Sequence, residues 1–132
     1  MTNHPIPLAE VILRIQSEGG SGNFLVIEDE ATGYYIQIAA SNGSPQLHAE
    51  AISNEHLDVT RWLSPDQHAT LERLGWTSPT KDCPNHFIDC QIHDADGREW
   101  LAGLIMKTFS AAYGVGAEAV LQMQINLEGE QA

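Results

Sequence analysis

The sequence contains few cysteines, few basic residues and no long apolar run, and each shortage excludes a class of protein. Two cysteines among 132 residues cannot form the disulfide framework of a small secreted domain, and a reducing compartment would keep them as thiols. No stretch approaches the ~20 apolar residues of a membrane-spanning helix, and the first residues lack the basic start and apolar run of a signal peptide. We therefore expect a cytoplasmic chain that does not bind membranes.

Basic residues are scarce relative to acidic ones. Six lysines and arginines face 18 aspartates and glutamates, which gives a formal net charge of −12. Such a charge repels the phosphates of nucleic acids and of anionic membrane surfaces, so we expect neither as a partner. The charge keeps the chain soluble, and it can also attract a basic partner protein.

A single domain accounts for the whole chain, residues 1–132, with a core at about 6–127. The length suits one compact domain. Apolar residues make up 42% of the chain, which is enough for a core that needs neither a disulfide nor a structural metal. We find no internal repeat, low-complexity tract or long linker.

Apolar periodicity predicts an α+β domain with elements in the order α-β-β-β-α-β-α, followed by a possible final strand. Its sheet is mostly antiparallel, has four to five strands and carries the helices packed on it. The segment 117–127 contains good helix formers, but its apolar and polar residues alternate, which favours a strand. The helices are expected at 6–18, 65–74 and 98–113, and the strands at 24–27, 34–40, 46–53 and 86–92.

The clearest helix signals surround the second helix. Ser64 suits the N-cap, Pro65 suits the first position, and Gln67 completes a capping box. Gly75 should end this helix. Trp100 is expected in the core, whereas Trp62 and Trp76, which flank this helix, either close the edge of the core, which is the favoured alternative, or lie at an interface.

Asn42-Gly43 lies between two strand-like runs and predicts a hairpin. A tight turn would pair Ile38 with Leu47, and a longer loop would pair Ala40 with Leu47. Either register leaves the same two faces, because side chains alternate along a strand. The expected core face consists of Ile36, Ile38, Ala40, Leu47, Ala49 and Ala51, and the expected outer face of Tyr35, Gln37, Ala39, His48, Glu50 and Ile52.

The outer face is the candidate partner-binding surface. If the helices cover one face only, the other exposes an aromatic and an aliphatic side chain among polar groups, which suits reversible protein binding. We therefore predict a protein-binding domain without catalytic residues, bound metal or cofactor. The candidate contact residues are Tyr35, Gln37, His48, Glu50 and Ile52.

The segment 83–93 supports a competing hypothesis of a small metal-binding or enzymatic domain. Cys83, His86, Cys90 and His93 are all zinc-type donors. In a strand, however, His86 and Cys90 point to one side and His93 to the other. The chain also lacks a Gly-x-Ser-x-Gly nucleophile motif. A regulatory or immunity-type subunit is a further alternative, because its sequence would look the same.

Short motifs along the chain resemble the TY-Chap domains, which are actinobacterial domains similar to type III secretion chaperones and to YbjN-like proteins. The resemblance covers roughly residues 8–115. It implies a helix–sheet–helix chaperone fold, an unidentified protein partner, frequent homodimers and no catalytic residues. The motifs are Ala49-Glu50, Ser53-Asn54, Leu57, Leu63-Ser64, Leu71, Leu74-Gly75-Trp76, Pro79, Asn85, Phe87 and Tyr113-Gly114-Val115.

Overall fold

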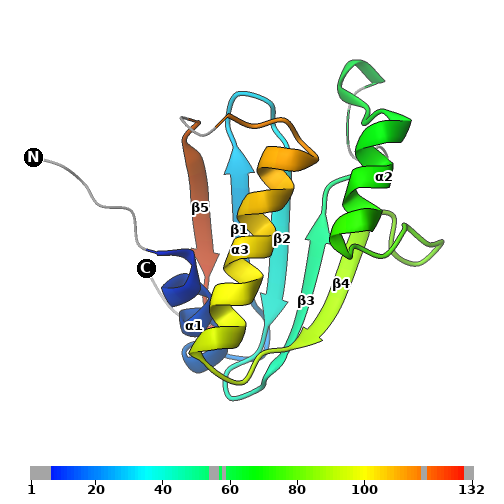
Figure 1. Cartoon of the computed structure of the whole chain (residues 1–132). Helices are drawn as coiled ribbons and strands as arrows, with labels where there is room; N and C mark the ends of the chain where they lie inside the picture. The colour runs from blue at the N-terminus through cyan, green and yellow to red at the C-terminus, as the bar shows by residue number, and fades with distance from the viewer. Residues whose placement is uncertain (1–6, 54–56, 58, 117–118, 130–132) are drawn as a thin grey trace, which may run out of the picture.

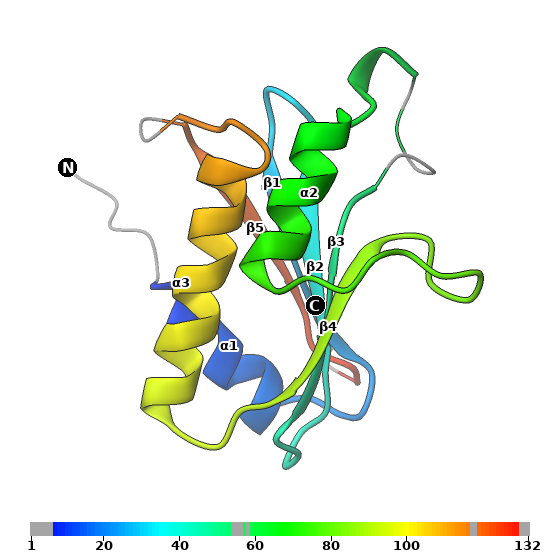
Figure 2. The same ribbon diagram turned by 45° about the vertical axis from the view of Figure 1, so that its right-hand side comes forward.

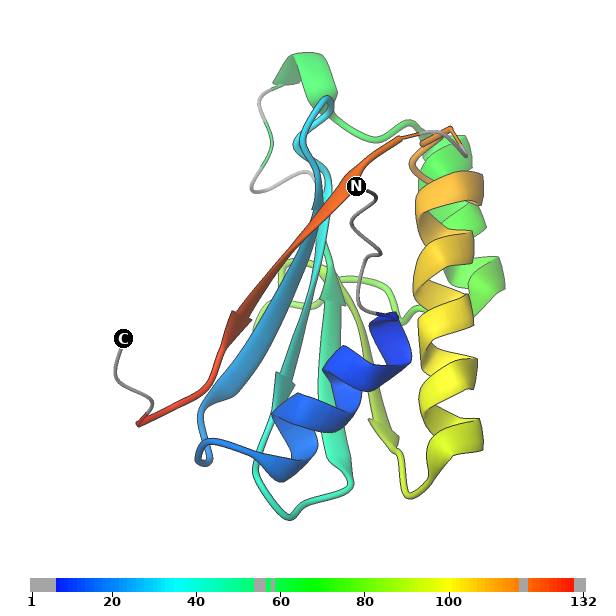
Figure 3. The same cartoon turned by 90° about the vertical axis from the view of Figure 1, so that its left-hand side faces the viewer.

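A five-stranded antiparallel sheet forms one layer of the molecule, and the α-helices of the described residues all lie on one of its faces (Figures 1 and 3). The computed structural model describes residues 7–53, 57, 59–116 and 119–129. The helices are α1 (Leu8–Ser17), α2 (Pro65–Leu74) and α3 (Ala95–Ala111), with a short 3-10 turn η2 (Val59–Arg61). The strands are β1 (Asn23–Asp29), β2 (Tyr35–Ala40), β3 (Gln46–Ala51), β4 (His86–Gln91) and β5 (Leu121–Asn126).

The strands are arranged in the order β4-β3-β2-β1-β5. Consecutive strands from β1 to β4 therefore lie side by side, and the last strand returns to pair with β1. The predicted α+β class and element order are confirmed, including the final strand. Alternation of apolar residues was the correct guide for that segment, because β5 packs one side only against the core.

The β2–β3 hairpin takes the longer-loop register. Ile38 pairs with Ala49 and Ala39 with His48, so the same register places Ala40 opposite Leu47. Gly43 has a φ of 83°, a backbone conformation that favours glycine. Asn42 does not share it, and instead its backbone N–H donates to the Gly20 carbonyl at 2.9 Å.

The core lies between the sheet and the helices. Leu25, Ile38 and Leu47 of the sheet and Ile15 and Ile105 of the helices are fully buried. Burial of each such side chain contributes about 1.5–3 kcal/mol relative to exposure. Figure 1 shows α1 and α3 on the side of β1, β2 and β5, and α2 on the side of β3 and β4, and Figure 2 shows the three helices next to one another over the sheet.

The predicted caps of α2 are confirmed. Ser64 and Gln67 form the reciprocal capping box, and Gly75 ends the helix with a φ of 112°. Trp76 then packs back into the core, where it is 2% exposed and its indole N–H donates to Thr108 Oγ1 at 3.0 Å. This contact joins the end of α2 to the last turn of α3.

Three expectations about α3 and the tryptophans are wrong. The helix begins at Ala95, because the Asp94 side chain accepts a hydrogen bond from the Gly97 N–H at 2.9 Å and caps residues expected to form a turn. Trp100 is 55% exposed, since the buried stripe of α3 runs along the opposite side through Leu101 and Ile105. Trp62 is 54% exposed instead of closing the core.

Adjacent residues of β1 test whether only one face of the sheet is buried, namely the face against the helices. Leu25→Ala is expected to lower the free energy of unfolding by about 2–5 kcal/mol, because it leaves a cavity in the core. Val26→Ala, on the other face of the same strand, should lower it by no more than about 1 kcal/mol. Urea denaturation of the two variants measures the difference, and equal losses would show that both faces of the sheet are buried.

Candidate functional site

The face of the sheet opposite the helices is open in the part of the chain that the structure describes (Figure 3). Its side chains are half-buried or exposed, whereas their neighbours along β1, β2 and β3 are mostly buried against the helices. We call this surface the open face. It consists of Phe24, Val26, Glu28, Tyr35, Gln37, Ala39, Gln46, His48, Glu50, Phe87, Asp89, Gln91, Gln122, Gln124 and Asn126.

The structure places four of the five predicted contact residues on the open face. Tyr35 and Gln37 come from β2, and His48 and Glu50 from β3, with Gln37 directly opposite Glu50. The placement expected for Ile52 is wrong. The strand ends at Ala51, so the alternation stops there, and Ile52 is only 2% exposed. Its backbone N–H and carbonyl are bonded to the Tyr35 carbonyl and the Tyr113 hydroxyl.

Sequence reasoning missed the aromatic residues that the neighbouring strands add to this face. Phe24 lies opposite Ala39, and Phe87 lies opposite Glu50. Applying the alternation of the central hairpin to β1 and β4 would have found both, but only once the strand order was known. The open face is therefore more aromatic than the hairpin alone indicates.

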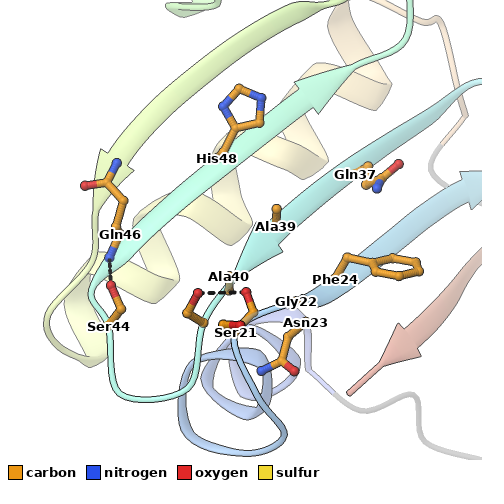
Figure 4. A pocket seen from close by; sticks show the side chains of 11 residues that line it. Ser21, Gly22, Asn23, Phe24, Gln37, Ala39, Ala40, Ser44, Gln46 and His48 are labelled. Atoms are coloured by element: carbon orange, nitrogen blue, oxygen red, sulfur yellow. Dashed lines mark hydrogen bonds between the residues drawn. The ribbon is translucent and has the colours of Figure 1, made fainter. Parts of the chain in front are cut away.

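A hollow of about 340 Å³ lies at one end of the open face (Figure 4). Phe24, Ala39 and His48 occupy facing positions on β1, β2 and β3. The small side chain of Ala39 leaves space between the two larger rings. Ser21 and Ser44 contribute to its lower rim from the adjoining loops.

His48 stands between two carboxylates on the open face. Its Nδ1 lies 2.6 Å from Asp89 Oδ1 on β4, and its Nε2 lies 2.9 Å from Glu50 Oε2. Partial burial alone would lower the pKa of His48, but the hydrogen bonds with Asp89 and Glu50 outweigh it and raise that pKa. The environment therefore favours a charged imidazolium.

Cys83 approaches the same group from the loop before β4. One donor atom each from His48, Glu50 and Cys83 lie within 4.8 Å of one another. Burial, with the nearby Glu50 carboxylate, raises the pKa of the Cys83 thiol and favours its protonated form. Asn85 holds the cluster in place, since its Nδ2 donates to Glu50 Oε1 at 3.1 Å.

The four donors of segment 83–93 do not converge. His86 is fully buried on the helix side of β4, where its ring stacks on His68 at 5.2 Å between centroids. Cys90 faces the same side as His86, and His93 is exposed beyond the strand. Within the described ranges, only His48, Glu50 and Cys83 form a group of three potential metal ligands.

A second hollow, of about 620 Å³, lies on the other side of the molecule between α1, α3 and β5. Its lining is mainly apolar and includes Leu8, Met106, Val120 and Met123. Met106 is 50% exposed and Val120 73% exposed. We call it the helix-side groove. Sequence reasoning missed this groove, because it depends on how far α1 and α3 separate over β5.

The two sheet histidines should titrate in opposite directions from the usual value of about 6.5. Burial, together with His68, lowers the pKa of His86, whereas that of His48 is raised. The His48 contacts therefore stabilise the fold fully below about pH 6.5 and are lost as the pH rises through its raised pKa. His86 has the opposite effect. Its neutral ring stabilises the fold above about pH 6.5, and this stability is lost as the pH falls towards its lowered pKa.

NMR titration of the histidine ring protons measures both values. Asp89→Asn should lower the pKa of His48 and leave that of His86 low. A His48 pKa at or below 6.5 in the unmodified protein would contradict the carboxylate contacts described above.

Among the described residues, each helix is too short or too polar to cross a lipid bilayer. Searches of curated proteins and of solved structures gave no significant match. One family, described as "T3SS (YopN, CesT) and YbjN peptide-binding chaperone 3", matches residues 6–126. The chain belongs to this family, TY-Chap3.

Proposed function

We propose that the protein is a non-catalytic chaperone that binds a segment of a partner protein on the open face of its sheet. The observation that carries the proposal is a surface of half-buried aromatic side chains that no helix of the described residues covers. Phe24, Tyr35 and Phe87 supply rigid apolar area among polar groups, as peptide-binding surfaces do. The peptide-binding description of the family supports the same role.

Charge indicates which peptides fit. The outward side chains of the five strands include Glu28, Glu50 and Asp89 but no lysine or arginine. The chain as a whole carries a formal charge of −12. A segment that combines lysine or arginine with apolar side chains would meet both the acidic and the aromatic groups. The hollow beside Phe24 would take one of the apolar side chains.

We further propose that the protein acts in the cytoplasm as a homodimer. The two cysteines are free thiols, which suits a reducing compartment. Resemblance to type III secretion chaperones implies frequent dimers, and the exposed Met106 and Val120 at the helix-side groove offer an apolar surface for a second copy. The open face of each copy would then remain available to a partner.

Selection from a phage-displayed library of random peptides tests the binding proposal. We expect the selected peptides to be rich in basic and apolar residues and to bind more weakly at high salt. Replacing Phe24 and Tyr35 together by serine should weaken the binding of a selected, fluorescently labelled peptide at least about tenfold, or ~1.4 kcal/mol. Fluorescence anisotropy measures the affinity, and circular dichroism checks that the variant is folded.

Val120→Ser is the matched control, because it removes an exposed apolar side chain from the helix-side groove. Peptide affinity should not change in this variant. The proposal is wrong if Val120→Ser abolishes binding while the Phe24 and Tyr35 variant binds normally, or if the library yields acidic peptides.

Sedimentation velocity tests the dimer separately. The wild-type chain should sediment as a dimer, and Met106→Asp should convert it to monomers by placing a charge in the apolar contact. Gln124→Asp, on the open face, should leave the dimer intact. A monomeric wild type at all concentrations would refute self-association without affecting the peptide proposal.

A further inference from the structure

Three chemically different potential metal ligands lie close together at the β3–β4 edge of the open face. A ring nitrogen of His48, a carboxylate oxygen of Glu50 and the Cys83 sulfur all lie within 4.8 Å of one another. Ligands around a tetrahedral zinc ion, with bonds of about 2.0–2.3 Å, are separated by roughly 3.3–3.8 Å. Small side-chain rotations would bring the three atoms to that separation.

Asp89 orients the imidazole as an outer carboxylate does in metal sites. Its Oδ1 is 2.6 Å from His48 Nδ1, which leaves Nε2 on the side of Glu50, at 2.9 Å from Oε2. A carboxylate bonded to the second ring nitrogen fixes the tautomer and makes the first a better ligand. The strand pairing sets this contact, because His48 lies directly opposite Asp89.

Asn85 positions the other two ligands. This residue is 5% exposed, and its Oδ1 accepts a hydrogen bond from the Ser53 N–H at 2.9 Å. Its Nδ2 donates to Glu50 Oε1 at 3.1 Å, so Oε2 is the oxygen directed to His48. Its carbonyl accepts a hydrogen bond from the Cys83 thiol at 3.6 Å. One buried side chain and its backbone thus hold both the carboxylate and the sulfur.

We propose that His48, Glu50 and Cys83 bind one divalent transition-metal ion of the zinc class, with the fourth position open to solvent. Thiolate and imidazole together select zinc over magnesium or calcium, which prefer oxygen ligands. Without an ion, a single positive charge on His48 offsets only one of the two carboxylates beside it, those of Glu50 and Asp89. The ion would replace the protons of Cys83 and His48, so its affinity rises with pH.

Metal titration of the full chain, stripped with a chelator, tests the site. Zn²⁺, measured against a competing dye, should bind once per chain, and more tightly at pH 8 than at pH 6, since protons compete for the ligands. Co²⁺ should give the near-ultraviolet charge-transfer band of a cobalt–thiolate bond. Cys83→Ser should abolish that band, and Cys83→Ser and His48→Gln should each weaken Zn²⁺ binding at least about tenfold.

The chain supplies a matched control for the cysteine ligand and one for the histidine ligand. Cys90→Ser removes the other cysteine, which faces the helix side, and His93→Gln removes an exposed histidine beyond the strand. Both should bind one Zn²⁺ with unchanged affinity. Asp89→Asn should weaken Zn²⁺ binding about tenfold but keep the cobalt–thiolate band, because it orients a ligand without being one.

Several outcomes would overturn the proposal. A cobalt–thiolate band that survives Cys83→Ser, or Zn²⁺ binding that is unchanged in His48→Gln, would exclude the assigned ligands. Binding without a defined stoichiometry would show only general attraction of cations to an acidic chain. These measurements use the free protein, so a negative result leaves the peptide-binding proposal untouched.

Discussion

One-sided burial of an antiparallel sheet is the constraint on which the rest of this molecule depends. Side chains alternate along each strand, so a buried residue fixes its neighbour on the opposite face. Leu47 and Ala49 are fully buried against the helices, and His48 between them must therefore face outward. A register shift of one residue would bury His48 and expose both neighbours. The core thus determines the position of every group on the open face.

The sequence predicts those parts of the fold that depend on local interactions. The caps of α2 involve residues at most a few positions apart, and Ser64, Gln67 and Gly75 take the expected roles. Strand alternation likewise identified β5, and the hairpin signal limited the register to two choices, of which the structure has one. For the caps and the hairpin, the deciding contacts are made within one element or one turn.

Predictions failed where a distant segment decides the outcome. Ile52 continues an alternating pattern, yet it is buried where the strand ends, and the Tyr113 hydroxyl, 61 positions away, donates to its carbonyl. Trp100 is a large apolar residue of the kind expected in a core, but the packing of α3 leaves its side chain exposed to solvent. Cys83 joins His48 and Glu50 only because β4 pairs with β3. Periodicity in a single sequence does not show that β3 pairs with β4.

The proposed peptide and metal sites occupy neighbouring parts of the open face, and both include the carboxylate of Glu50. Glu50 pairs across the strands with Gln37 and with Phe87, so it adjoins the aromatic side chains as well as His48. Because the ion would replace one proton each from His48 and Cys83, the net charge of the open face would not change, but the Glu50 carboxylate would no longer be free to pair with a basic side chain of a peptide. Because Coulomb attraction near a surface depends on such single charges, bound zinc would weaken the preference for basic residues and leave the aromatic contacts in place. Metal binding would thereby change which segments the open face selects, while the fold that presents it stays the same.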